Sequence, residues 1–138
     1  MQGLSRRHQA RELALQVLFQ REFIKDIDLH NTLDYFKGVI DSSNEVYQYA
    51  EFITFGVSQN QSKIDSKIES FSQNWSLNRI ALVDLTIMRV AVFELLFSNN
   101  EVPPKASIDE AVELAKQYST TDSSSFINGI LDQIYKNM

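Results

Sequence analysis

The sequence predicts an all-α protein, and three observations support that prediction. Glycine and proline together account for six of the 138 residues, whereas average usage would give roughly sixteen, so turn-rich all-β folds and disordered linkers are disfavoured. Apolar side chains recur at steps of three and four along most of the chain, which is the period of helices with one buried face. Hydrophobic residues make up 43% of the sequence, enough to form a buried core.

We expect about seven helices and no strand. The expected helices cover residues 5–23, 31–40, 46–57, 64–71, 79–97, 108–118 and 126–134. The polar residues 59–62 separate the third helix from the fourth. Two helix starts carry the spacing of a capping box, in which each side chain satisfies a backbone N–H group. These boxes are Ser42 with Glu45 and Ser107 with Glu110.

The helix expected at 79–97 differs from the others, because fourteen of its nineteen residues are apolar and they surround it on every side. Charged side chains interrupt it every five residues. Each central charge would cost about 2.5–3.5 kcal/mol in a bilayer, which argues against a membrane span. A helix that is apolar all round in a soluble protein lies at the centre of the core. We therefore expect its charged residues to be paired internally or to reach the surface at the helix ends.

The last two helices are separated by a polar segment, residues 119–125. Asp122 lies in this segment just before the last helix, where an acidic residue is favoured as an N-cap. Within the last helix, Asn128 and Gly129 would normally favour a turn, but the apolar period continues through them. We therefore expect Gly129 to lie at a close contact between helices.

The net charge of −5 is unevenly distributed. The first eleven residues contain Arg6, Arg7 and Arg11 and no acidic residue. The other 10 of the 13 basic side chains and all 18 acidic ones follow, so the rest of the chain carries a formal charge of −8. Cations are disfavoured at a helix N-terminus by the helix dipole, and a bound polyanion would compensate for them. A solvated helix start is the alternative, and the charge pattern leaves both open.

The residues offer no evident chemistry for catalysis. The sequence has no cysteine and only two histidines, His8 and His30, which excludes thiolate sites and disfavours a metal cluster. It has no glycine-rich phosphate loop and no Ser–His–acid arrangement. We therefore expect neither enzymatic activity nor a cofactor. The first residues lack the apolar segment of a secretory signal, so we expect a cytoplasmic protein with no membrane segment.

Three segments resemble, in order, the NusB family of bacterial transcription antitermination factors. They are SRRHQARELALQVLFQ (residues 5–20), WSLNRIALVDLTIMRVAVFEL (75–95) and VPPKASIDEAVELAKQYSTTDSSSFINGILDQI (102–134). The first is similar to the arginine-rich first helix of that family, and the second to the signature of its central helix. The third is similar to its capped helix, its threonine–aspartate–serine loop and its phenylalanine–asparagine–glycine helix. Residues 25–73 match only weakly.

The resemblance implies an all-α fold in which two small helical bundles pack into a single compact RNA-binding domain over residues 1–138. It also implies partners. NusB-like proteins pair with NusE, which is also a ribosomal protein of the small subunit. The pair binds the boxA element of nascent RNA and, with the transcription elongation complex, supports processive transcription of ribosomal RNA.

The resemblance further assigns site residues. Those that match the RNA surface of the family are Arg6, Arg7, Arg11, Asp122 and Phe126. Phe19 and Asp84 match positions at the NusE contact, where the family usually has tyrosine and glutamate. Recognition of single-stranded RNA needs cations along the phosphates and an exposed ring for stacking. Phe126 either supplies that ring or belongs to the buried stripe of the last helix.

Other interpretations stay open on the sequence. NusB-like helical domains also precede the catalytic domain of some ribosomal RNA cytosine methyltransferases, but such an enzyme would need a doubly wound domain after Met138. A helical scaffold without an RNA role is a further class, which the uneven charge disfavours. The first helix is also suited to being masked in a homodimer, through the same arginine surface.

Overall fold

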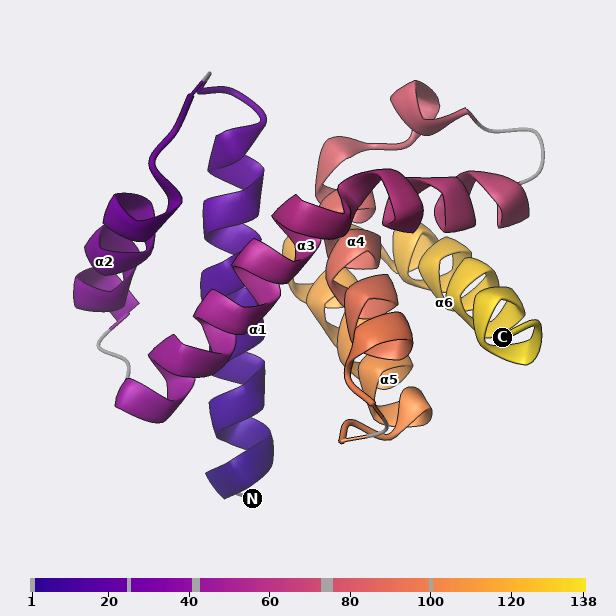
Figure 1. Cartoon of the computed structure of the whole chain (residues 1–138). Coiled ribbons are helices and arrows are strands. Elements are labelled where there is room, and N and C mark those ends of the chain that lie inside the picture. The colour runs from indigo at the N-terminus through magenta and orange to yellow at the C-terminus, as the bar shows by residue number, and fades with distance from the viewer. Residues whose placement is uncertain (1, 25, 41–42, 73–75, 100) are drawn as a thin grey trace. The chain divides into compact units, whose positions relative to one another are not determined.

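The structure, a computed structural model, describes residues 2–24, 26–40, 43–72, 76–99 and 101–138. Within these ranges it contains six α-helices, one turn of 3-10 helix and no strand. In chain order they are α1 (Gln2–Arg21), α2 (Leu29–Ile40), α3 (Asn44–Phe71), η1 (Leu77–Arg79), α4 (Leu82–Phe97), α5 (Pro104–Tyr118) and α6 (Thr121–Lys136) (Figure 1). The prediction of an all-α fold is confirmed.

The helix count falls just below the expected seven because residues 46–57 and 64–71 belong to one helix, α3. Asn60 lies inside α3 with non-helical backbone angles (φ −117°, ψ 18°) and kinks it. The polar residues 59–62 therefore mark a bend and not a loop. The chain divides at the same place into two compact units, the first unit (residues 1–59) and the second unit (residues 60–138).

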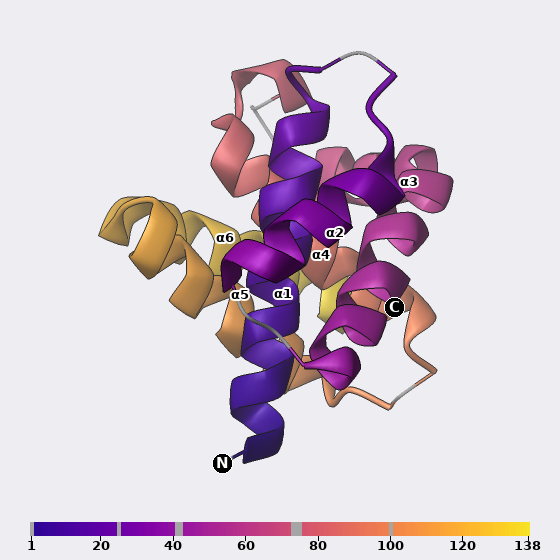
Figure 2. The same ribbon diagram turned by 90° about the vertical axis from the view of Figure 1, so that its left-hand side faces the viewer.

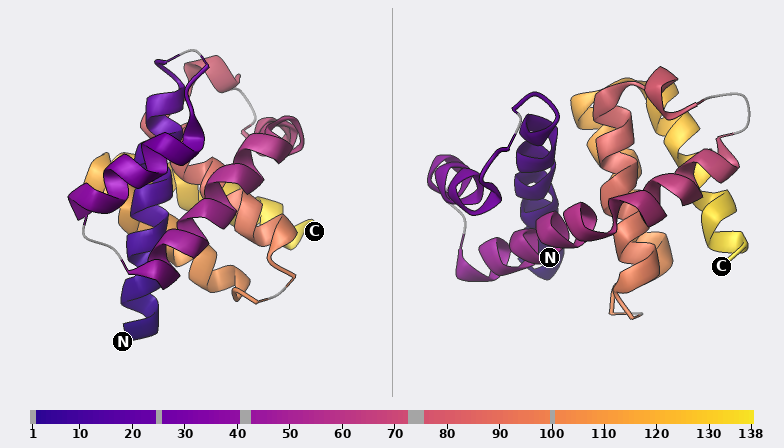
Figure 3. Two further views of the ribbon diagram at one scale, coloured as in Figure 1. Left: turned by 60° about the vertical axis from the view of Figure 1, so that its left-hand side comes forward. Right: turned by 45° about the horizontal axis from the view of Figure 1, so that its top comes forward.

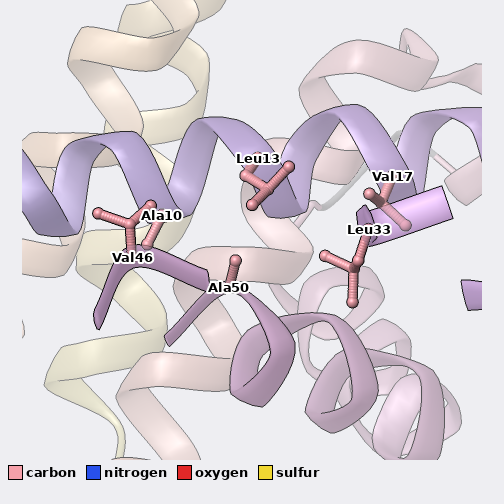
Figure 4. Packing of buried hydrophobic residues seen from close by; sticks show 6 residues of the cluster. All are labelled: Ala10, Leu13, Val17, Leu33, Val46 and Ala50. Atoms are coloured by element: carbon pink, nitrogen blue, oxygen red, sulfur yellow. The ribbon is translucent and has the colours of Figure 1, made fainter. Parts of the chain in front are cut away.

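The first unit holds α1, α2 and the first half of α3 around a small apolar cluster. α2 packs against α1 (Figures 1 and 2). The cluster takes residues from all three helices, namely Ala10, Leu13 and Val17 of α1, Leu33 of α2, and Val46 and Ala50 of α3 (Figure 4). The steps of three and four along α1 place its three side chains on one face. Burying one leucine or valine of such a cluster contributes about 1.5–3 kcal/mol.

In the second unit α4 is the central helix. Both α5 and α6 pack against it and against each other (Figure 3). All of residues 84–95 are buried, which confirms that the helix apolar on every side lies inside the core. Among the described residues, no helix is long and apolar enough to cross a membrane.

The buried charge of Arg89, near the middle of α4, is paired as expected. Its Nε and Nη2 donate hydrogen bonds of 2.8 and 3.0 Å to the two carboxylate oxygens of Asp65, in the second half of α3. This two-pronged geometry suits a guanidinium, which is planar and presents parallel N–H groups. Removing either partner alone would leave a buried charge uncompensated, which typically costs about 3–5 kcal/mol.

Two helices begin at other residues than expected. α4 begins at Leu82, and Arg79 ends the preceding turn η1. α5 begins at Pro104, because proline lacks an N–H group and its fixed φ suits the first position of a helix. Ser107 is therefore a buried residue inside α5, and the expected capping box with Glu110 is wrong.

The other expected box, at Ser42, lies outside the described residues. Its neighbour Ser43 precedes α3, and the Ser43 Oγ accepts a hydrogen bond of 3.3 Å from the backbone N–H of Val46. This is the contact of an N-cap side chain with the third residue of a helix.

The last helix also begins earlier than expected. α6 starts at Thr121, and its N-cap is Thr120, whose Oγ1 accepts a hydrogen bond of 3.0 Å from the backbone N–H of Ser123. Asp122 thus lies in the first turn and is not the cap. The expected close contact at Gly129 is wrong too, because a Cβ atom added there would meet nothing within 4 Å.

Candidate nucleic-acid interface

Two arginines at the start of α1 meet the start of α3. The Arg6 Nη1 lies 2.7 Å from the Glu45 Oε2, and the two side chains are 48% and 71% exposed. The Arg7 guanidinium carbon lies 5.0 Å from the centre of the Tyr49 ring, within cation–π range. Exposed ion pairs contribute only about 0.2–1 kcal/mol. Breaking the ion pair of Arg6 with Glu45 therefore costs little free energy when another anion binds Arg6.

Arg11 behaves differently from these two arginines. It is only 2% exposed and is among the largest fully buried side chains of the chain. From Ala10 to Leu18, α1 is buried on most sides, with Glu12 and Gln16 only partly buried. The structure therefore places Arg6 and Arg7 at the surface and Arg11 inside, although the sequence presents the three as one basic group.

Aromatic side chains complete this surface. Together with the two arginines they line one hollow, which we call the α1–α3 hollow. Its lining residues are Arg6, Arg7, Glu45, Gln48, Tyr49 and Phe52. Phe52 is 47% exposed, and its ring centre lies 5.9 Å from that of Tyr49. Phe52 is not among the site residues expected from the sequence. The available signal was that Phe52 lies off the apolar stripe of α3, so that its ring faces water at a cost unless a ligand covers it.

The second unit brings together three of the residues that the resemblance assigns. These three residues line one hollow at the starts of α4 and α6. They are Asp84, Asp122 and Phe126, and the other lining residues are Arg79, Ile80, Ala81 and Ser123. Phe126 is half-buried, so it belongs partly to the packing of α6 and partly to this surface. Asp84 is matched to the NusE contact and the other two to RNA, yet they share one hollow.

Asp84 is held in place by a hydroxyl that sequence reasoning missed. It is only 4% exposed, and its Oδ2 accepts a hydrogen bond of 2.7 Å from the Ser123 Oγ. Its Oδ1 is buried and accepts no hydrogen bond from the described residues. The carboxylate lies in the first turn of α4, where the helix dipole stabilises negative charge.

The remaining assigned residue, Phe19, lies on α1 in the first unit. Its ring makes an edge contact with Phe23, with ring centres 5.1 Å apart and planes at 64°. Phe19 is partly buried, while Phe23 is an exposed ring at the end of α1. Among the described residues, no group of three or more histidine, aspartate or glutamate side chains is placed to hold a metal ion.

Fold and surface together define a small helical protein in which arginines at the start of α1 lie beside aromatic rings of α3. The profile of the NusB family matches residues 8–136. The curated transcription antitermination protein NusB of Bdellovibrio bacteriovorus is 47% identical over 133 residues, which cover 96% of this chain and 97% of that protein. The chain belongs to the NusB family, as its three motifs indicate.

Solved structures agree with this assignment. The NusB structure from T. maritima is 38% identical with a TM-score of 0.84, covering 94% of this chain and 90% of that one. A chain in a crystal structure of the antitermination factors NusB and NusE in complex with double-stranded RNA is 26% identical with a TM-score of 0.87. That match covers 97% of this chain and 98% of the other.

Proposed function

We propose that this protein is a transcription antitermination factor that pairs with NusE and binds the boxA element of nascent ribosomal RNA transcripts. The pair would support processive transcription as part of the elongation complex. The observation that carries the proposal is membership of the NusB family together with exposed arginines on an otherwise acidic chain. The protein would act in the cytoplasm as a regulator and not as an enzyme.

We propose two groups of RNA-binding residues, one in each unit. Arg6 and Arg7 would contact phosphates, because the exposed ion pair of Arg6 and the ring contact of Arg7 are both weak enough to be exchanged for a phosphate. Arg11 would contribute from its buried position by supporting the start of α1. Phe126 would stack on a base, with Asp122 beside it in the same hollow. Residues 1–138 would work as a single RNA-binding domain.

The residues proposed to contact NusE are Phe19 in the first unit and Asp84 in the second unit. An aromatic ring that is only partly buried is a favourable anchor for a protein partner. Asp84 lines the hollow at the starts of α4 and α6, and its negative charge there would attract a basic group of the partner.

The test is a co-purification of tagged protein with NusE, followed by titration of boxA-containing RNA with the pair and with each protein alone. We expect the pair to bind RNA more tightly than either component. A protein that forms a homodimer and neither recruits NusE nor binds the RNA would instead be a helical scaffold. The molar mass from light scattering separates the homodimer from the pair.

A further inference from the structure

We propose that the α1–α3 hollow is a nucleotide subsite for single-stranded RNA. An unpaired base would lie against Phe52 and Tyr49, and its phosphate would take Arg6 from Glu45. This inference rests on the proposed RNA-binding function and adds an aromatic contact to it. The site lies within the first unit, where α1 and the first half of α3 share one apolar cluster with α2.

The phosphate part of the subsite follows from the Arg6–Glu45 ion pair. Both side chains are about half exposed or more, and their atoms lie 2.7 Å apart. An exposed pair of this kind is weak in water. An RNA phosphate accepts two parallel hydrogen bonds from a guanidinium, as a carboxylate does, and its binding also releases counterions into solution. Glu45 therefore holds Arg6 in place in the free protein and competes with RNA for it.

The base part follows from the two rings. Tyr49 and Phe52 lie three residues apart on α3, with ring centres 5.9 Å apart and planes inclined at 33°. Arg7 makes a cation–π contact of 5.0 Å with the Tyr49 ring, while Phe52 stays 47% exposed. Every base has a flat face that stacks on such a ring. The Gln48 amide, which also lines the hollow, offers a donor and an acceptor to a base edge.

The combination favours a nucleotide over other occupants. Each nucleotide carries one anion and one flat ring, and the hollow offers a releasable arginine beside an exposed aromatic side chain. An acidic peptide would satisfy the arginine but not the ring. A second copy of the chain is the other occupant to test, because an exposed phenylalanine also suits self-association.

The experiment compares Phe52→Ala with a matched control, Tyr35→Ala. Tyr35 is another exposed ring of the first unit, 67% exposed on α2, and it lines a different hollow. The probe is fluorescently labelled single-stranded RNA containing boxA, titrated with the protein–NusE pair. We expect Phe52→Ala to weaken binding about tenfold or more without changing its salt dependence, since no phosphate contact is lost. Tyr35→Ala should bind as the unchanged protein does, and Phe52→Trp should restore binding.

A second variant tests the competition for Arg6. Glu45→Gln removes the competing carboxylate and should tighten RNA binding by about two- to fivefold, the range expected for one exposed ion pair. Weaker binding by Glu45→Gln would contradict the displacement step. Circular dichroism confirms that each variant is folded.

The outcomes separate this subsite from the wider function. If Arg6→Ala weakens RNA binding while Phe52→Ala does not, the RNA-binding function stands and the subsite is wrong. If neither change affects binding, the proposed function fails at this surface as well. If Phe52→Ala instead converts a dimer to a monomer and leaves RNA affinity unchanged, the hollow is a self-association face and the subsite is overturned.

Discussion

The Ser123 hydroxyl donates a hydrogen bond of 2.7 Å to Oδ2 of Asp84, and this contact joins the first turn of α6 to the first turn of α4. The same turn of α6 carries Asp122, which the resemblance places beside RNA, while Asp84 is placed at the partner protein. The Ser123 hydroxyl thus links Asp84, which is assigned to NusE, to the helix turn that carries Asp122, which is assigned to RNA.

For the Ser123–Asp84 contact, we predict that Ser123→Ala lowers the free energy of unfolding by about 1–3 kcal/mol, since a buried carboxylate oxygen loses its donor. Asp84→Asn keeps an oxygen that accepts this hydrogen bond, so its stability should stay within about 1 kcal/mol. Asp84→Asn should nevertheless weaken pairing with NusE, because the charge is lost. Urea unfolding and a NusE pull-down measure the two effects. If Asp84→Asn binds NusE as well as the unchanged protein does, the negative charge of Asp84 plays no part in the proposed contact.

The arginines are expected to separate into two classes. Arg6→Ala and Arg7→Ala should each flatten the slope of log affinity against log salt by about 0.7, the value for one phosphate contact on a single strand. Arg11→Ala should instead lower the melting temperature, because it truncates a side chain only 2% exposed. Titrations at four salt concentrations and thermal unfolding distinguish the classes. An unchanged melting temperature for Arg11→Ala would contradict its structural role.

The start of α6 allows capping to be separated from RNA recognition. Thr120→Ala should cost about 1 kcal/mol of stability, because Thr120 is the N-cap. Asp122→Asn loses only a favourable interaction with the helix dipole, about 0.3–1 kcal/mol. RNA binding by Asp122→Asn should stay equal or tighten, since a negative charge near a polyanion is gone. A clear loss of affinity in the folded variant would show that the carboxylate accepts a hydrogen bond from the RNA.

Gly129 offers a stabilising change. It lies inside α6, and a Cβ atom there would meet nothing within 4 Å. Gly129→Ala should therefore raise the free energy of unfolding by about 0.5–1 kcal/mol, because alanine loses less backbone entropy in a helix. Gly38→Ala, in an equally open position of α2, is the matched variant. If urea unfolding shows that Gly129→Ala is less stable, Gly129 does lie at the close contact between helices that the sequence suggests.

The contact between Tyr47 and Asp34 predicts a loss of stability at alkaline pH. The Tyr47 hydroxyl donates a hydrogen bond of 2.7 Å to the Asp34 carboxylate, and this bond, with burial and the negative charge, raises the pKa of Tyr47 to about 12. The folded state thus holds the proton more tightly than the unfolded state, where the pKa is about 10. The resulting stability is complete below pH 10 and is lost as the pH rises toward 12. Urea unfolding at several pH values should show this loss, and Tyr47→Phe should abolish it.

The sequence predicted the elements whose signal is dense and local. The helix at the centre of the second unit was predicted because apolar residues surround it, and Arg89 was expected to be paired because a charge inside such a helix is costly without a partner. Its partner, Asp65, was not predicted, because it lies 24 residues away on another helix.

The candidate site was predicted only in part, for physical reasons. Burial of Arg11 depends on neighbours from other parts of the chain, which a charge pattern does not reveal. The start of α6 was missed because the run from Ser119 to Ser125 offers several residues that cap equally well. Phe52 was missed although it lies off the apolar stripe of α3, because the sequence does not show whether a single apolar residue outside a stripe is exposed or packed. The motif resemblance supplied the assigned site residues, whereas the packing of helices within each unit supplied their neighbours.

The ion pair of Arg6 with Glu45 joins residues 39 positions apart in the sequence, and this separation limits how far the molecule can be reduced. A peptide copied from the first helix would keep the cationic charge but lose the rings and the acid that α3 contributes. Such a peptide would bind any polyanion through its charge, because it lacks the rings of α3 on which an unpaired base could stack. A minimal fragment with the complete α1–α3 hollow must therefore extend at least through Phe52 and must fold.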